Sequence, residues 1–431
     1  MTTKPLTVLF MPESAYGPTN NCIGIGDVLR RRGHRVIFAA EASWKDRLTP
    51  YGFEETLVDL APPSDGPADA GQFWKDFVRN SAPEFRRPTI EQLTGFMVPT
   101  WQALIDGSRF CHPQLRGILD AVRPDIVVED NVVSFPALLT AGVPYVRIVS
   151  CNPLEVPGTA VPPAYSGLPS DDSSQWVEFR EEHARTHRAL WAEFDAWVQE
   201  EGAPPLPELE FVHTSTDLNL YVYPEVIDYV ARRPLDATWH RLDSSVRRTE
   251  DSVDVRGEWL TRREGSALIY LSLGSLGSAD VDLMKRIVHV LAETPHRYIV
   301  STGPRHAEYE LAPNMWGAEF LPQTQVLPLV DLVITHGGNN TITESFHFGK
   351  PTVVLPIFWD QHDNAQRVSE TGFGVRVRTY SFTDSELRGA IEGVLADSAL
   401  RSRVAVTGER IRGRDGLTAA AGHIEALAWR K

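Results

Sequence analysis

The chain has 431 residues, 42% of them hydrophobic, and a formal net charge of −15. This length exceeds the usual core of a single domain, so two domains are expected, each with enough apolar residues to bury a core. The acidic residues are spread along the chain, which argues against nucleic acid or an anionic membrane as a partner.

The sequence shows no targeting signal, and we therefore expect a cytoplasmic protein. No apolar run reaches transmembrane length, and the first residues lead directly into a predicted strand, so no signal peptide is expected. The three cysteines, Cys22, Cys111 and Cys151, are odd in number and scattered, which suits a reducing compartment.

The amino-terminal half alternates predicted strands with predicted helices, which is typical of a doubly wound parallel sheet. A helix is expected from Ile23 to Arg32, and Gly33 ends it. The predicted strands cover 7–11, 35–39, 126–128, 145–149 and 218–223. We therefore expect an α/β domain over residues 1–240, followed by a polar linker within 236–258.

Two aromatic-rich stretches, about 73–110 and 176–197, interrupt this alternation. Core packing accounts for most of these side chains, but their irregular spacing also permits a pocket for a flat, hydrophobic molecule. Phe77, Phe85 and Trp101 are the candidates for that pocket.

The second half contains a predicted phosphate-binding turn. A buried strand over 329–334 is followed by Thr335-His336-Gly337-Gly338 and a helix from Asn339 to Phe348. A helix N-terminus attracts anions through its free N–H groups and its dipole, and glycines let the backbone approach the ligand. A diphosphate could bind there without a metal ion.

The next strand, 351–357, ends at Phe358-Trp359-Asp360-Gln361. Asp360 and Gln361 thus follow a strand at the sheet edge where open α/β sheets bind ligands. A carboxylate beside a carboxamide can accept from and donate to sugar hydroxyls. Glu344, one turn inside the preceding helix, could hold both hydroxyls of a ribose.

These residues, in this order, resemble the donor-binding signature of the UDP-dependent glycosyltransferase superfamily (family 1 type), in particular the actinobacterial enzymes that act on small molecules. Its pattern is H-x-G-x-N/G-S/T-x-x-E, then G-x-P, then P-x-x-x-D-Q. The matching residues are His336, Gly338, Asn340, Thr341, Glu344, Gly349, Pro351, Pro356, Asp360 and Gln361. The segment Phe320-Leu321-Pro322-Gln323 resembles the W/F-x-P-Q that begins the signature.

The resemblance implies the GT-B fold, in which two Rossmann-like domains face each other across a cleft. Residues 1–240 would bind the acceptor and 241–431 the nucleotide sugar, with the final helix packing back towards the first domain. His336 and Thr341 would contact the diphosphate, Glu344 the ribose, and Asp360 with Gln361 the sugar. The remaining predicted donor contacts are Ser275, Phe320, Gln323, Gly338, Asn339, Asn340 and Trp359.

The chain departs from the family at the catalytic base. Members carry a histidine fifteen residues before the R-G-H that ends the first helix, and Pro18 occupies that position here. The aspartate that polarises the histidine is matched by Asp130, which we take as the candidate base. Pro18, Thr19 and Asn20 are candidate acceptor contacts in the same loop. Two alternatives remain: a different group in a shifted loop, or an acceptor, such as an amine or an acidic phenol, that needs little base help.

Two spacings that resemble metal sites have simpler explanations. Asp280-Val281-Asp282 follows Gly277-Ser278 at a helix start, which favours capping. His183 and His187 lack a third ligand in the sequence, and we expect them at the surface. No metal ion is predicted.

The predicted function is inverting, metal-independent transfer of a hexose, most readily glucose, from a UDP-sugar to a hydrophobic small molecule. Polyketides, macrolides, phenols and amines are the acceptor classes, and no cofactor beyond the co-substrate is expected. The protein would be a monomer or homodimer. The alternatives are a non-catalytic sugar-nucleotide-binding partner protein and a GT-B sugar-nucleotide epimerase.

Overall fold

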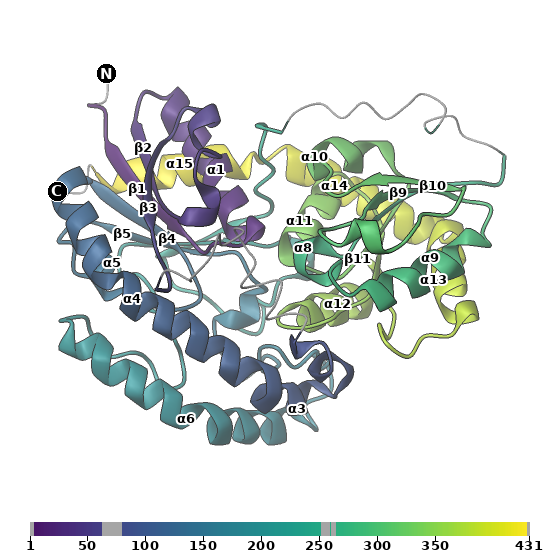
Figure 1. Ribbon diagram of the computed structural model, residues 1–431, viewed down its shortest axis with the longest axis horizontal. Coiled ribbons are helices and arrows are strands. Elements are labelled where there is room, and N and C mark those ends of the chain that lie inside the picture. The colour runs from purple at the N-terminus through teal and green to yellow at the C-terminus, as the bar shows by residue number, and fades with distance from the viewer. Residues whose placement is uncertain (1–3, 63–79, 251–258, 260–263, 429–431) are drawn as a thin grey trace.

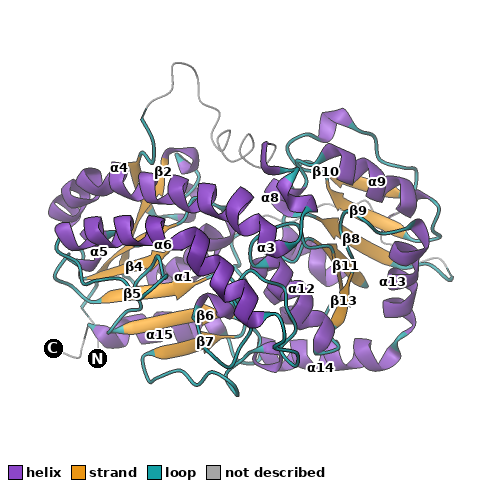
Figure 2. Cartoon of the chain, turned by 90° about the horizontal axis from the view of Figure 1, so that it is seen from below, coloured by secondary structure: helices purple, strands orange, loops and turns teal. Residues whose placement is uncertain are grey.

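The computed structural model describes residues 4–62, 80–250, 259 and 264–428. Within this part of the chain, two parallel sheets stand side by side, each flanked by helices (Figures 1 and 2). The first has seven strands in the order β3-β2-β1-β4-β5-β6-β7, and the second has six in the order β10-β9-β8-β11-β12-β13. The predicted α/β architecture of two doubly wound parallel sheets is confirmed.

The first sheet has a separate apolar layer on each face, because successive strand residues point to opposite sides. Val8 and Phe10 pack with helices α1 and α15, whereas Leu9 and Met11 pack with α4 and α6. Its strands are β1 (Thr7–Pro12), β2 (Arg35–Glu41), β3 (Glu54–Val58), β4 (Ile126–Asp130), β5 (Tyr145–Val149), β6 (Leu218–Val222) and β7 (Trp239–Leu242). Its helices are α1 (Tyr16–Arg31), α3 (Thr89–Gln92), α4 (Val98–Val122), α5 (Pro136–Leu139) and α6 (Trp176–Glu200).

The second sheet carries the predicted donor signature. Its strands are β8 (Leu268–Ser272), β9 (Arg297–Ser301), β10 (Met315–Ala318), β11 (Leu332–Thr335), β12 (Thr352–Val354) and β13 (Gly374–Arg376). The helices of this half are α8 (Gly274–Gly277), α9 (Val281–Ala292), α10 (Gln323–Val326), α11 (Asn339–His347), α12 (Gln361–Glu370), α13 (Asp384–Ala396), α14 (Ser398–Arg412) and α15 (Gly416–Leu427). The strand order reverses between β8 and β11, and open α/β sheets bind ligands beyond the carboxyl ends of the strands at such a point.

Helix α15 leaves the second half of the chain and lies against α1 of the first (Figure 1). Glu425 of α15 accepts hydrogen bonds from Arg32 at 2.6 Å and from His34 at 2.8 Å. A Cβ on Gly24 of α1 would come within 2.9 Å of Leu417, so the small residue permits this close packing. The predicted boundary at residue 240 falls inside β7, and the stretch expected as a linker therefore contains the edge strand of the first sheet.

Helix α1 begins at Tyr16, well before the expected start at Ile23. Pro18, Thr19 and Asn20 therefore lie in the first turns of this helix and not in a loop. A proline is tolerated there because the first N–H groups of a helix have no intrahelical partner. The Thr19 hydroxyl donates to the Glu13 carbonyl at 3.0 Å and helps to fix the helix start.

The two spacings that resemble metal sites have structural roles. Asp280 accepts from the Leu283 N–H and caps α9, as predicted. The surface prediction is wrong for His187, a buried residue of α6 that stacks on His183 and packs near Phe211. The period of α6 places His187 on its core face, where Nδ1 contacts the His183 carbonyl at 3.1 Å and Nε2 has no hydrogen-bond partner among the described residues. Within the described ranges, no group of three or more His, Cys, Asp or Glu side chains is arranged to hold a metal ion.

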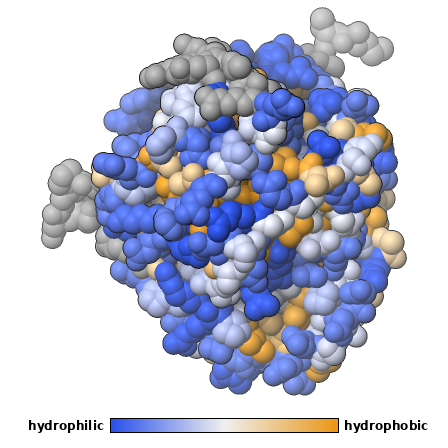
Figure 3. Space-filling view, turned by 90° about the vertical axis from the view of Figure 1, so that its right-hand side faces the viewer, coloured by the Kyte–Doolittle hydropathy of each residue, from blue (hydrophilic) through white to orange (hydrophobic). Residues whose placement is uncertain are grey.

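The face formed by the second half of the chain is mainly hydrophilic, with apolar side chains in separated patches (Figure 3). None of the helices in the described residues is long and apolar enough to cross a membrane.

Candidate functional site

The loop after β11 is built around the ring of His336. A Cβ on Gly274 would come within 2.8 Å of this ring and one on Gly338 within 2.5 Å, so glycines on both sides make room for it. Gly337 has φ +89°, a left-handed conformation that favours glycine. Burial lowers the pKa of His336 to about 4, while a hydrogen bond to the Ser272 backbone opposes that shift, so the ring is neutral.

The N-terminus of α11 follows this loop. Gly338 is its N-cap residue and supplies no capping side chain, so the first N–H groups of α11 are left for a ligand. The side chains of Asn339 and Asn340 instead cross to the first domain. Asn339 donates to the carbonyls of Ser150 and Val222, both at 2.9 Å, and Asn340 donates to the Gly17 carbonyl at 3.0 Å. Their side chains thus join the two domains beside the turn.

Glu344 lies one turn further into α11 and is buried among polar partners. Its two oxygens accept from Arg247 Nη1 at 2.8 Å and from Gln323 Nε2 at 2.6 Å. Arg247 also pairs with Glu250, so one arginine lies between two carboxylates. Burial raises the pKa of Glu344, and Arg247 opposes that shift. Thr341 contacts Gln323 at 3.3 Å, which brings three predicted donor residues together.

Phe320 stands at the open side of this cluster, with 58% of its surface exposed. An exposed aromatic ring just before Gln323 can stack on a flat base. The ring of Tyr16, from the first domain, lies 5.4 Å from it between centroids. Ser275 belongs to α8, but its side chain is outside the described part of the structure.

Asp360 and Gln361 begin α12. Gln361 Oε1 accepts from the N–H groups of Ile357 and Phe358 at 3.1 and 3.2 Å, which fixes the turn that follows β12. Asp360 is buried, and its Oδ2 accepts from the Asn152 N–H at 2.8 Å. Burial raises the pKa of Asp360 to about 7.

The predicted sugar site lies next to the predicted diphosphate site. Asn364 of α12 donates to the Gly337 carbonyl at 2.9 Å and to Asp360 Oδ2 at 3.3 Å. One side chain therefore bridges the glycine turn after β11 and the carboxylate at the start of α12. A diphosphate on the turn and a hexose on Asp360 could be held side by side.

The predicted acceptor aromatics pack against the second domain. Trp101 lies 5.1 Å from Trp359 between ring centroids, and Phe85 lies 4.9 Å from Phe358. Phe85 and Trp101 are both buried, so in this structure they form interdomain core, the simpler of the two roles expected for them. Trp359 has φ +57°, which turns its ring into this cluster. Phe77 lies outside the described residues.

Asp130 ends β4 and is buried at the carboxyl edge of the first sheet. The Ser150 hydroxyl donates to its Oδ2 at 2.5 Å, and Asn21 donates to the Ser150 oxygen at 2.7 Å. Asn21 also donates to Asn340 at 3.0 Å, so a polar chain connects Asp130 with the start of α11. Burial raises the pKa of Asp130 well above its usual range, and Glu155 and Glu13 add to this shift.

Pro18 lies in the first turn of α1, directly after Gly17, whose carbonyl accepts from Asn340. The position that the family gives to histidine is thus close to the donor turn. Glu13 follows β1 at the same edge, and burial raises its pKa as well. It is the carboxylate that sequence reasoning missed, although its place after a predicted strand was a usable signal.

The sequence is similar to those of known glycosyltransferases. The family model described as UDP-glucoronosyl and UDP-glucosyl transferase matches residues 258–407. The chain is 25% identical to a demethyllactenocin mycarosyltransferase of Streptomyces fradiae, over 97% of this chain and 86% of the relative. It is also 25% identical to an NDP-glycosyltransferase of Bacillus subtilis, over 96% of this chain and 95% of the relative.

The glycosyltransferase of kitacinnamycin superposes with a TM-score of 0.73 and 23% identity, covering 99% of this chain and all of that one. A match over the full length of both chains extends the likeness from the donor signature to both domains. The chain is a glycosyltransferase with the GT-B fold, and its residues 258–407 match the UDP-glucoronosyl and UDP-glucosyl transferase family. In this glycosyltransferase the matched family segment holds His336, Glu344 and Asp360, the residues that meet around the turn after β11.

Proposed function

We propose that this glycosyltransferase moves a hexose, glucose in the first instance, from a UDP-sugar to a hydrophobic small molecule with inversion at the anomeric carbon. One observation carries the proposal: the His336 turn, Glu344 and Asp360 gather at the carboxyl ends of β11 and β12. They are linked through Asn364 and Gln323. This arrangement offers an anion site, a ribose carboxylate and a sugar carboxylate in sequence.

In the proposed reaction, negative charge develops on the departing diphosphate. The free N–H groups of α11 and the neutral His336 ring would stabilise that charge. Such preorganised donors contribute several kcal/mol in a site that excludes water. We propose that no metal ion or cofactor is needed, because these groups supply the positive potential locally while the chain as a whole carries −15.

We propose Asp130 as the group that receives the acceptor's proton. Burial makes its carboxylate a stronger base, although a smaller fraction is ionised at neutral pH. Because Ser150 already donates to Asp130 Oδ2, the proton would pass through the Ser150 hydroxyl or require that side chain to turn away. An acceptor that is an amine or an acidic phenol would need this help least.

We propose the acceptor class, a polyketide, macrolide or phenol, from the names of the relatives. Similar proteins are named as a mycarosyltransferase of demethyllactenocin and an oleandomycin glycosyltransferase of Streptomyces antibioticus. Trp101, Tyr165 and Phe211 pack with Trp359 in a buried aromatic cluster, so this cluster does not identify the acceptor surface.

A thymidine-diphosphate donor is the second candidate. A structural neighbour, VinC, was solved in complex with dTDP and favours it. Glu344 favours UDP, because a carboxylate with two oxygens can accept from both ribose hydroxyls.

The test of the proposed function is an acceptor screen with UDP-glucose, read by mass spectrometry and by UDP release. Acceptor-dependent UDP release with a hexosylated product supports the proposal. Conversion of the donor to a new nucleotide sugar without an acceptor would show an epimerase instead. Donor binding without turnover of any acceptor would show a non-catalytic partner protein.

A further inference from the structure

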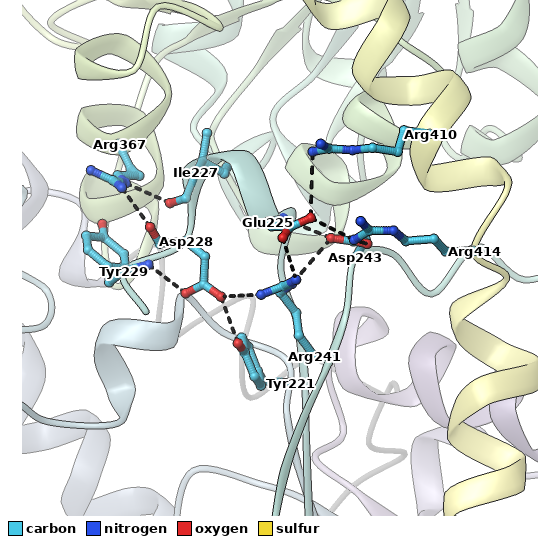
Figure 4. Close-up of polar contacts among 10 residues, drawn as sticks. All are labelled: Tyr221, Glu225, Ile227, Asp228, Tyr229, Arg241, Asp243, Arg367, Arg410 and Arg414. Atoms are coloured by element: carbon cyan, nitrogen blue, oxygen red, sulfur yellow. Dashed lines mark hydrogen bonds and ion pairs between the residues drawn. The ribbon is translucent and has the colours of Figure 1, made fainter. Parts of the chain in front are cut away.

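Helix α12 docks on the first domain along one face. Asp363 accepts from the backbone N–H groups of Tyr165 at 2.6 Å and of Gly167 at 2.8 Å. One turn later, Arg367 donates to the carbonyls of Ile227 and Asp228, both at 2.7 Å (Figure 4). The helix that begins with the sugar-binding pair is therefore held by the acceptor domain over its whole length.

Asn152 is the contact at the sugar-binding end of this face. It follows β5 in the first domain and is only 1% exposed. Its backbone N–H donates to Asp360 Oδ2 at 2.8 Å. Its side-chain nitrogen donates to Asn364 Oδ1 at 2.8 Å and to the Tyr223 hydroxyl at 3.0 Å, and its oxygen accepts from the Leu154 N–H at 2.9 Å. Asn152 thus contacts both Asp360 and the residue that bridges Asp360 to the glycine turn.

The arrangement fixes which way the Asp360 carboxylate points. Asn152 and Asn364 both donate to Oδ2, so this oxygen is engaged by protein and the carboxylate cannot turn freely. The other oxygen, Oδ1, is then the one that would accept from a sugar hydroxyl. Because Asn152 belongs to the opposite domain, its shorter hydrogen bond to Oδ2 exists only when the two domains are closed, whereas the Asn364 bond lies within α12.

We infer that Asn152 is a positioning residue for the sugar: it orients Asp360 across the domain interface and so couples domain closure to recognition of the hexose. The inference rests on the proposed function of the Asp360 site. It assigns Asn152 no contact with the nucleotide, whose predicted partners, Phe320, Gln323 and Glu344, lie elsewhere in the cleft.

The inference separates the affinity for UDP-glucose from the affinity for UDP. Asn152→Ala keeps the backbone N–H that reaches Asp360 and removes the side-chain hydrogen bonds to Asn364 and Tyr223. It should leave the dissociation constant of UDP within about twofold, and should weaken UDP-glucose binding and kcat/KM by roughly 3- to 10-fold, the range for hydrogen bonds between neutral groups. Tyr223→Phe removes one anchor of Asn152 with little change of shape. It should leave UDP affinity unchanged and weaken UDP-glucose binding by a smaller factor than Asn152→Ala does. It replaces Asn152→Ala as the test if that variant fails to fold. Ser170→Ala is the matched control, because Ser170 contacts Glu370 at the far end of the same face and not Asp360.

A double-mutant cycle decides whether Asn152 acts through Asp360. If it does, Asn152→Ala should cost almost nothing further in the Asp360→Ala background, so the two effects on UDP-glucose affinity are strongly non-additive. Additive effects, equal loss of UDP and UDP-glucose affinity, or a Ser170→Ala effect as large as that of Asn152→Ala would overturn the inference. The affinities are measured without an acceptor, so absence of transfer would count against the proposed function and not against this role of Asn152.

Discussion

Replacing Glu344 by glutamine tests the assignment of the nucleoside site, because it removes a charge and keeps the shape. In the structure, the side chains of Arg247 and Glu344 are 6% and 3% exposed and lie 2.8 Å apart. Removing one partner of a buried pair typically costs about 3–5 kcal/mol, and Glu250 remains to compensate Arg247, so we expect a loss of about 2–4 kcal/mol in the free energy of unfolding. UDP affinity should fall roughly 10- to 100-fold, as expected for lost hydrogen bonds to a charged group.

Asp360→Asn is the matched control, since it makes the same chemical change in a second buried carboxylate. It should leave UDP affinity within about threefold and lower the affinity for UDP-glucose and the turnover. Isothermal titration with UDP and with UDP-glucose measures both effects, and denaturant unfolding reports stability. The assignments fail if both variants lose UDP affinity equally, or if Glu344→Gln binds UDP as the wild type does.

Three further predictions use the same assays. First, kcat/KM for the donor should rise with pH through about 7, because the Asp360 carboxylate accepts from sugar hydroxyls only when it is ionised. This rise should disappear in Asp360→Asn, and a rise that persisted in that variant would show that another group causes it. Second, Asp130→Asn should abolish transfer to alcohols, a loss of about 10²–10⁴-fold for base catalysis, and Pro18→His should accelerate poor alcohol acceptors more than good ones; unchanged rates with alcohols would remove Asp130 from the mechanism. Third, UDP-glucose should outcompete a TDP-deoxysugar in mixed-donor reactions, and the reverse preference would overturn the choice of donor.

The fold and the donor turn could be predicted because their signals are local. The strand over 329–334, the glycines after it and the following helix lie next to one another in sequence, and the structure forms β11, the turn and α11 there. The start of α1 was misplaced because Pro18 reads as a loop residue, although a helix tolerates proline in its first turn. Strand β7 was missed because its charge-mixed sequence covers a sheet edge, where polar side chains face solvent.

The contacts between the domains could not be predicted, since they join residues far apart in the chain. Asn152 and Asp360, from opposite domains, are 208 positions apart, and Asn340 lies 323 positions from Gly17, whose carbonyl accepts from it. No periodicity marks a single asparagine or arginine as the partner of a distant carboxylate. The roles of Phe85 and Trp101 also depended on the tertiary structure, because a buried aromatic and a pocket wall have the same sequence signal.

We propose that this protein transfers a hexose from UDP-glucose to a hydrophobic acceptor. The most direct measurement incubates the wild-type protein with UDP-glucose and a panel of macrolides, polyketides and phenols, and follows UDP and product mass together. We expect UDP release that depends on the acceptor and equals the amount of hexosylated product. Asp360→Ala should lose this acceptor-dependent UDP release. Release of UDP without a glycosylated product, or no binding of UDP-glucose by the wild type, would contradict the proposal.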